Sequence, residues 1–309
     1  MESFLVAVNA VVPFLCYITF GYVMKIKGVV KEDFLQQLNK IFYPFMTFYN
    51  IYKADASSLP RPVMLIFCGV SILVLEVILV LTVPRLVKEN PRRGVIIQAI
   101  YRSNFVLFGL PLTVSVFGDV ASSVAAMVVT VVITIYNTTS VVILEMFNSE
   151  GKTDVKTILV NVVKNPLLQG AMVGLVFFFL GIHVPKSLLT PIAAFADATS
   201  PVALFVLGGT LHFNAIRGNL KYLVPALSLK LLVLPAVMLA LGYAFGLRDL
   251  ELFLLVAIYG TPVAAASYPM AQNMGGDGEL AGQFVVISTV VAVGTLFGWI
   301  FFMKSVGLI

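Results

Sequence analysis

Long runs of apolar residues separated by short polar joints dominate this sequence. About ten of these runs approach 20 residues, the length that an α-helix needs to cross a bilayer core of about 30 Å. Little of the chain is left for a soluble domain. The pattern predicts an all-α integral membrane protein with ten transmembrane helices. The predicted spans are 4–24, 34–52, 62–84, 94–117, 120–146, 162–182, 188–211, 220–246, 251–274 and 280–303.

The fourth and ninth predicted spans resemble each other at a shift of 158 residues. Six identities recur in twenty-one positions, where Ala99, Ile100, Tyr101, Pro111, Gly118 and Asp119 match Ala257, Ile258, Tyr259, Pro269, Gly276 and Asp277. The spacing of Pro13, Gly21 and Gly28 likewise recurs in Pro166, Gly174 and Gly181. We therefore predict a first five-helix repeat at 1–147, a cytoplasmic joint at 148–161 and a second five-helix repeat at 162–309. Because five is odd, the second repeat enters the membrane from the opposite side, so the repeats have inverted topology.

Both of these repeated spans contain helix-breaking residues. The fourth contains Gly109 and Pro111, and the ninth contains Gly260, Pro262 and Pro269. A proline removes a backbone donor and frees a carbonyl, and irregular backbone at membrane depth survives only where it is buried in protein or lines a cavity. Inverted repeats with broken helices are typical of secondary transporters. We expect the substrate site where the broken helices 4 and 9 cross.

The charged residues fit a membrane protein and define its orientation. Only 11% of residues are charged, while 60% are hydrophobic. With the N-terminus outside, twelve of the 20 Lys and Arg residues fall in cytoplasmic loops and their flanks, five fall outside and three within spans. The positive-inside rule then predicts a multi-pass protein with both termini non-cytoplasmic. The net charge of +5 is explained by this orientation and needs no nucleic acid as a partner.

Three stretches carry a resemblance to a known family. They are RSNFVLFGLPL from Arg102, NPLLQGAMVGLVFFFLGIHVP from Asn165 and TPVAAASYPMAQNMGGDGELA from Thr261. With them, the chain resembles the auxin efflux carrier family of bacterial and plant permeases over nearly all ten spans. The resemblance implies a location in the cell membrane and a fold similar to bile acid symporters and sodium/proton antiporters. It also implies organic anions as substrates, either auxin-like acids or small carboxylates such as malate and malonate.

The resemblance places the family's crossover asparagine at Asn104 and its crossover proline at Pro262, and both are candidate residues of the substrate site. Plant members often have a proline before that asparagine, where this chain has Ser103, and their long cytoplasmic loop is missing. A bacterial-type carboxylate permease is therefore favoured over an auxin carrier.

Several polar residues near the predicted crossing are candidates for substrate binding. Asn104 offers an amide donor to a carboxylate, and Ser103 and Thr261 add hydroxyl donors. The alternative for Asn104 is an interhelical hydrogen bond that only stabilises packing. Arg102 lies inside the fourth span, where a cation must face a cavity, pair with an acid or extend to the interface. Asn137 in the fifth span faces either the site or a neighbouring helix.

Four charged residues inside spans are candidates for coupling or charge pairing. Glu76 in the third span and Lys230 in the eighth are costly to bury, so a neutralising pair between them, or with Arg102, is one hypothesis. A purely structural pair is the other reading. Asp197 and Lys40 each lie four residues before a proline in corresponding spans, and a proton-linked carboxylate at Asp197 is a further hypothesis.

The sequence gives no support to an enzyme. The motif GGDG from Gly275 lacks the first glycine of the GxGD motif of intramembrane aspartyl proteases, and the two histidines, His183 and His212, do not form HExxH. Asp119 and Asp277 follow glycines before the next spans and are predicted to be N-caps. No metal or cofactor is expected.

The predicted mechanism is alternating access by a secondary-active or facilitative transporter of small organic anions. Spans 1, 2, 6 and 7 resemble a scaffold, and spans 3–5 and 8–10 resemble a moving unit. The alternative is a sodium/proton antiporter or sodium-coupled symporter of the same fold, although antiporters normally need acidic residues at the crossover, where this chain has Ser103, Asn104 and Thr261. Coupling to Na⁺ or H⁺, the direction of transport and homodimer formation stay open.

Overall fold

The computed structural model describes residues 2–53, 62–118, 120–148, 166–210 and 216–309. These residues are almost entirely helical, and the one β-type contact among them is an isolated bridge. Helical segments lie in all ten of the predicted spans. Their bounds, with η for a π-helical turn, are α1 (Glu2–Ile26), α2 (Glu32–Tyr52), α3 (Pro62–Leu86), α4 (Asn90–Tyr101), η1 (Phe105–Gly109), α5 (Leu110–Phe117), α6 (Val120–Met146), α8 (Pro166–Leu180), α9 (Lys186–Thr210), α10 (Ile216–Ser228), η3 (Leu229–Val233), α11 (Leu234–Ala244), α12 (Leu250–Gly260), α13 (Ser267–Asn273) and α14 (Gly278–Ser305).

Four helical stretches in the described part of the chain are long and apolar enough to cross a membrane. They are Pro62–Leu86, Lys186–Gly209, Ile216–Ala244 and Gly278–Ser305. The predicted fourth and ninth spans do not qualify as single long helices, because the fourth is interrupted at residues 102–104 and the ninth at residues 261–266. The second interruption includes Pro262, as predicted, whereas the first lies before Gly109 and Pro111, which belong to η1 and α5. The protein is thus an all-helical membrane protein, while ten crossings arranged as two inverted repeats stay a prediction.

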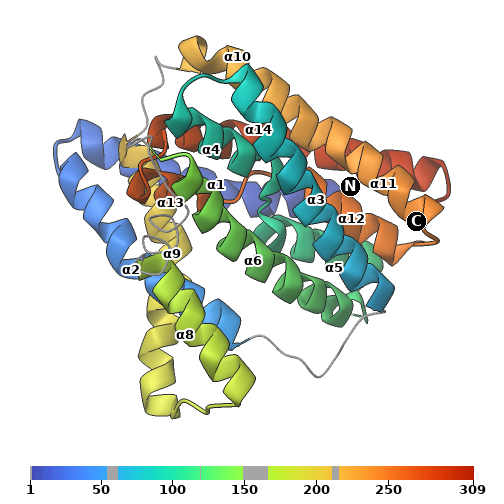
Figure 1. Cartoon of the computed structure of the whole chain (residues 1–309), viewed down its shortest axis with the longest axis horizontal. Coiled ribbons are helices and arrows are strands. Elements are labelled where there is room, and N and C mark those ends of the chain that lie inside the picture. Colours follow the sequence, from blue (N-terminus) through green and yellow to red (C-terminus); the bar gives the residue numbers. More distant parts are fainter. Residues whose placement is uncertain (1, 54–61, 119, 149–165, 211–215) are drawn as a thin grey trace.

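The helices pack in two groups. In the first, α2 lies against both α8 and α9, and α1 lies against α9 (Figure 1). The remaining helices form the second, which we call the crossover group: α3, α4, η1, α5 and α6 from the first half of the chain, and α10, η3, α11, α12, α13 and α14 from the second. The two groups meet along α1, which also lies against α5 and α14. The division into spans 1, 2, 6 and 7 and spans 3–5 and 8–10 as scaffold and moving unit stays a prediction.

Glycines allow α1 and α9 to approach at backbone contact. A Cβ atom added at Gly208 would lie 1.9 Å from the carbonyl oxygen of Ile18, and one added at Gly21 would lie 1.9 Å from that of Phe205. Small residues permit this kind of close helix packing in membranes. The contact joins the first half of the chain to the second within the α1/α2/α8/α9 group.

One pair of glycines matched by the repeat shares its conformation. Gly28 follows α1 with φ of 68°, and Gly181 follows α8 with φ of 62°. Both values lie in the left-handed region, which glycine adopts without the steric penalty of a side chain. The shared spacing of Pro13, Gly21 and Gly28 with Pro166, Gly174 and Gly181 therefore coincides with a shared helix ending.

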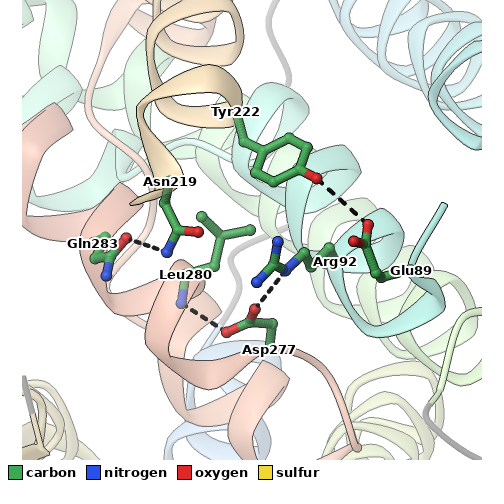
Figure 2. Close-up of polar contacts among 7 residues, drawn as sticks. All are labelled: Glu89, Arg92, Asn219, Tyr222, Asp277, Leu280 and Gln283. Carbon is green, nitrogen blue, oxygen red and sulfur yellow. Dashed lines mark hydrogen bonds and ion pairs between the residues drawn. The ribbon is translucent and has the colours of Figure 1, made fainter. Parts of the chain in front are cut away.

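An ion pair links the two halves of the crossover group near the start of α4. The guanidinium Nε of Arg92 lies 3.1 Å from Oδ2 of Asp277, and the Asp277 amide donates to the carbonyl of Pro91 at 3.0 Å. Oδ1 of Asp277 accepts from the amide of Leu280 at 2.9 Å, which confirms the predicted N-cap (Figure 2). Its counterpart Asp119 lies outside the described residues.

The start of α10 joins the same junction. The ring of Tyr222 lies under the Arg92 guanidinium at 5.3 Å, and its hydroxyl donates to Glu89 at 3.4 Å. Beside them, Asn219 donates to the side-chain oxygen of Gln283 at 2.8 Å (Figure 2). Hydrogen bonding to the Glu89 carboxylate, first from its own backbone, lowers the pKa of this exposed group. The junction thus brings together the N-terminal ends of α4, α10 and α14.

Candidate functional site at the crossing of the two broken helices

The interruptions of the fourth and ninth spans lie against each other. After α4 ends at Tyr101 and α12 at Gly260, Ser103 and Val263 form an antiparallel bridge. The Asn104 amide donates to the Pro262 carbonyl at 2.8 Å, and the Ala264 amide donates to the Arg102 carbonyl at 3.4 Å. In this register Asn104 lies opposite Pro262, its partner at the shift of 158 residues. The structure therefore brings together the two residues at which the sequence places the crossing.

Extended pairing sends neighbouring side chains to opposite faces of the crossing. In a strand, residues i and i+2 share a face and residue i+1 points away. Arg102 and Asn104 accordingly lie on one face, and Ser103 lies on the other. The two predicted donors, Asn104 and Ser103, therefore meet different surroundings.

Asn104 has a donor without a partner. Its side chain is 8% exposed, and its Nδ2 has no hydrogen-bond partner among the described residues. The hydroxyl of Thr261 at the other break is fully buried and also lacks a partner within the described structure. A buried polar group without a hydrogen bond costs about 1–3 kcal/mol. This structure therefore gives no support to a packing hydrogen bond from the Asn104 amide nitrogen.

Arg102 is buried at the crossing and is held by α6 and α13. It is 4% exposed, and its guanidinium donates to Oδ1 of Asn137 at 2.7 Å and to the hydroxyl of Ser140 at 3.3 Å. It also contacts the sulfur of Met270. The predicted site residues Arg102 and Asn137 thus meet, with the Asn137 oxygen orienting the cation.

Lys230 contacts the face of the crossing to which the Ser103 side chain points. It is fully buried on η3, and its Nζ donates to the Ser103 hydroxyl at 2.7 Å and to the Ile100 carbonyl at 3.3 Å. In a continuous helix that carbonyl would accept from the amide of Asn104, which here donates to Pro262. Lys230 therefore occupies a carbonyl that the break sets free, and it uses the hydroxyl of Ser103.

Glu76 is buried elsewhere in the crossover group. This α3 side chain is 5% exposed, and it accepts from the hydroxyl of Thr139 at 2.6 Å. The hydroxyl of Thr139 donates to the hydroxyl of Tyr101 at 3.5 Å, and the Tyr101 hydroxyl lies 2.7 Å from that of Ser140. Among the described residues no ion pair joins Glu76 to Lys230, so the hypothesis of a neutralising pair between them is not supported by the geometry.

The remaining charged candidates do not meet at the crossing. Asp197 is exposed on α9, within the α1/α2/α8/α9 group, and no contact in the described structure joins it to Arg102, Asn104 or Lys230. The side chain of Lys40 lies outside the described residues. Their similar positions before Pro201 and Pro44 reflect the repeat but do not bring Asp197 to the candidate site.

Sequence reasoning missed several residues that surround the crossing. The ring of Tyr136 lies 5.7 Å from that of Tyr101, and its buried side chain lies beside Ser103. The Ser288 hydroxyl accepts from the amide of Val263 at 3.0 Å. One signal was available in α6, where the polar run YNTTS from Tyr136 interrupts an apolar span. Ser288 in α14 lies in the apolar stretch VVISTVV, and the sequence there does not indicate a contact with the crossing.

Comparison with known proteins supports the predicted family. The family model described as "Membrane transport protein" matches residues 6–300. A relative from Methanothermobacter thermautotrophicus, described as an uncharacterized transporter, is 22% identical over 302 residues that cover 96% of this chain and 98% of the relative. Another such transporter, from Methanocaldococcus jannaschii, is 24% identical over 312 residues that cover 96% and 99%.

A third relative matches only part of the chain. It comes from Rhizobium meliloti, its description reads "Putative malonate transporter", and it is 29% identical over 147 residues that cover 46% of this chain and 44% of the relative. The match of the family model to residues 6–300 is what defines the family. The chain belongs to the membrane transport protein family, which is the auxin efflux carrier family that its motifs resemble.

Proposed function

We propose that this protein is a secondary transporter of small organic anions, with carboxylates such as malate or malonate as substrates, and that the carboxylate binds at the crossing of the two broken helices. The observation that carries the proposal is the unpartnered buried amide nitrogen of Asn104, on the face of the crossing that also carries the buried cation of Arg102. The malonate description of the Rhizobium meliloti relative is compatible with this substrate class.

The chemistry of these groups favours an anion. An amide N–H and a hydroxyl donate hydrogen bonds, and a bond to a charged acceptor contributes about 1.5–3 kcal/mol. Arg102 shares a face with Asn104 by the alternation of the extended segment, so its positive charge lies on the side where a carboxylate would bind. A carboxylate accepting from Asn104 would satisfy its orphaned donor, while Thr261 offers a second unpartnered hydroxyl at the other break. Auxin-like acids carry the same carboxylate and are the bulkier members of this substrate class.

The acid that an antiporter would need is missing from the crossing. Residues 102–104 and 261–266 contain no Asp or Glu. Glu76, a buried acid of the crossover group, is connected to Arg102 by a chain of hydrogen bonds. The chain runs from Glu76 through Thr139, Tyr101 and Ser140 to the guanidinium. A sodium/proton antiporter or sodium-coupled symporter is therefore the second candidate, with Glu76 as its titrating or coupling group.

We further propose that transport occurs by alternating access. The α1/α2/α8/α9 group would act as the scaffold, and the crossover group would carry the bound carboxylate past it. The partition of the helices into these two packing groups supports this division. A multi-pass location in the cell membrane, with both termini non-cytoplasmic, follows from the distribution of Lys and Arg.

Transport by the purified protein in liposomes tests the proposal. We expect uptake of radiolabelled malonate or malate that is competed by other small carboxylates, and Asn104→Ala should weaken binding about tenfold or more by removing a donor to a charged acceptor. Asn219→Ala is the matched control, because Asn219 is also a buried amide but bonds Gln283 at the junction of Figure 2. It should lower thermal stability without weakening binding. Sodium-for-proton exchange with no response to carboxylates would refute the proposal.

A further inference from the structure

A proline leaves a carbonyl without its helical donor next to Lys230. In a regular α-helix the carbonyl of Leu231 would accept from the amide of residue 235, but that residue is Pro235, which has no N–H. The helix is also widened here, because η3 is a π-helical turn in which the amide of Leu234 donates to the carbonyl of Leu229. The carbonyl of Leu231 therefore cannot accept its regular α-helical hydrogen bond.

Trp299 supplies the missing donor. Its indole Nε1 donates to the Leu231 carbonyl at 3.0 Å, from α14 across to η3. The side chain is half-buried, and its ring packs edge to face against Phe302 with the centroids 6.0 Å apart. A buried tryptophan N–H normally needs an acceptor, so the two groups satisfy each other.

The η3 turn supports both breaks of the crossing. On one side Lys230 bonds the carbonyl of Ile100 and the hydroxyl of Ser103, next to Asn104. On the other side Pro235 lies against the end of α12, since a Cβ atom added at Gly260 would come within 3.1 Å of the proline ring. A shift of this turn would therefore displace the backbone at both ends of the candidate binding site.

We infer that Trp299 is a positioning residue for the substrate site: by bonding the carbonyl that Pro235 orphans, it fixes the π-helical turn that holds Lys230 against the first break. Trp299 itself does not touch the crossing. Its effect passes from Leu231 to Lys230, and from Lys230 to Ser103 and the backbone of Ile100. The effect on substrate binding rests on the proposed function, whereas the effect on the crossing does not.

Hydrogen–deuterium exchange of the purified protein tests the inference without any substrate. Trp299→Phe removes the indole N–H and keeps an aromatic ring. We expect the amides of Arg102 and Asn104, which are hydrogen-bonded at the break, to exchange about tenfold faster in this variant, the effect of losing one buried hydrogen bond. Phe302→Leu is the control, because it reduces the ring packing of Trp299 and leaves the bond to Leu231 in place. It should change this exchange by less than about threefold.

A second variant keeps the test decisive if Trp299→Phe folds poorly. Trp299 is the only tryptophan in the chain, so growth with the benzothiophene isostere of tryptophan replaces this one N–H by sulfur at nearly constant volume. It should reproduce the faster exchange at Arg102 and Asn104. Unchanged exchange there, or an equal effect of Phe302→Leu, would overturn the inference.

Malonate binding then tests the route through Lys230. Trp299→Phe should weaken binding several-fold, and it should cause no additional loss in a Lys230→Gln background, because both changes act through one contact. Losses that multiply in the double variant would show that Trp299 acts by another route. If the wild-type protein binds no carboxylate while Trp299→Phe still loosens the crossing, the proposed function fails and the positioning role stands.

Discussion

Replacing Asn104 by aspartate separates an anion site from a packing contact. The substitution nearly preserves the shape of the side chain, but it exchanges the unpartnered Nδ2 donor for a carboxylate oxygen. If Asn104 only fills space, the substitution should leave substrate affinity unchanged. If Asn104 donates to a carboxylate, substrate affinity should fall, because the donor is lost and a negative charge faces the substrate.

The magnitude can be worked out from two terms. Loss of a hydrogen bond to a charged acceptor costs about 1.5–3 kcal/mol, which corresponds to a loss of affinity of roughly 10- to 150-fold. Two like charges about 4 Å apart repel by about 4 kcal/mol at an effective dielectric of about 20, which corresponds to roughly a further 1,000-fold. Arg102 shares the face of Asn104 and offsets part of the repulsion. We therefore expect Asn104→Ala to bind malonate about tenfold or more weakly, and Asn104→Asp to lose measurable binding.

Equilibrium binding of radiolabelled malonate to purified protein measures both effects, with thermal unfolding of each variant recorded in parallel. Unfolding can be followed with a thiol-reactive dye in a Cys16→Ser background, because Cys16 is exposed whereas Cys68 is fully buried and becomes reactive only when the protein opens. The reasoning is refuted if Asn104→Asp binds malonate as well as Asn104→Ala does while both variants remain folded. Binding within threefold of wild type by both would remove Asn104 from the site.

Three further predictions concern the fold. Gly208→Ala should lower the unfolding temperature strongly, because its Cβ would lie 1.9 Å from a carbonyl oxygen of α1 and overpacking costs about 1–3 kcal/mol or more, whereas Gly294→Ala, with open space around its Cβ, should be neutral. Asp277→Asn should lower the unfolding free energy by less than about 1 kcal/mol, because it removes the ion pair with Arg92 but keeps the N-cap. Asp277→Ala should lower it by about 1 kcal/mol more, because it also removes the cap. Equal losses in the two variants would contradict this prediction. In intact cells lacking other reactive thiols on the protein, Lys304→Cys should react with an impermeant maleimide and Lys88→Cys should not, because both termini are predicted to be non-cytoplasmic.

Local signals in the sequence were sufficient to predict the helices, their breaks and the cap at Asp277. Apolar runs define helix positions, and Gly and Pro near the middle of a span indicate a break, so these features depend on neighbouring residues. A single proline is a weaker signal, because Pro13, Pro44 and Pro201 lie inside unbroken helices. The shift of 158 residues added one long-range fact, that Asn104 and Pro262 are equivalent, and the structure places them opposite each other. Repetition within a single chain thus gave information about a contact between distant segments.

The partners of the buried charges could not be predicted in the same way. Burial cost requires each charge to have a partner but does not identify it. Lys230 has a freed carbonyl and a hydroxyl as partners rather than Glu76, because the break in α4 creates an acceptor that exists only in the folded chain. Asp197 matched Lys40 in sequence depth, yet it is exposed on α9, because position along a span does not define which face of the helix meets the crossing.

The pairing of Asn104 with Pro262 explains why the two halves cannot play identical roles. In an antiparallel pair of this type the two residues would exchange two backbone hydrogen bonds, but Pro262 has no N–H, so only the Asn104 amide donates. The Asn104 carbonyl is then left to accept from the amide of Phe108 at 3.1 Å, which starts the η1 turn. At the first break a new helical turn therefore begins directly after Asn104. At the second break Pro262 contributes its carbonyl and its rigid ring. A binding residue is therefore expected at position 104 and not at its repeat partner, although the repeat makes the two positions equivalent.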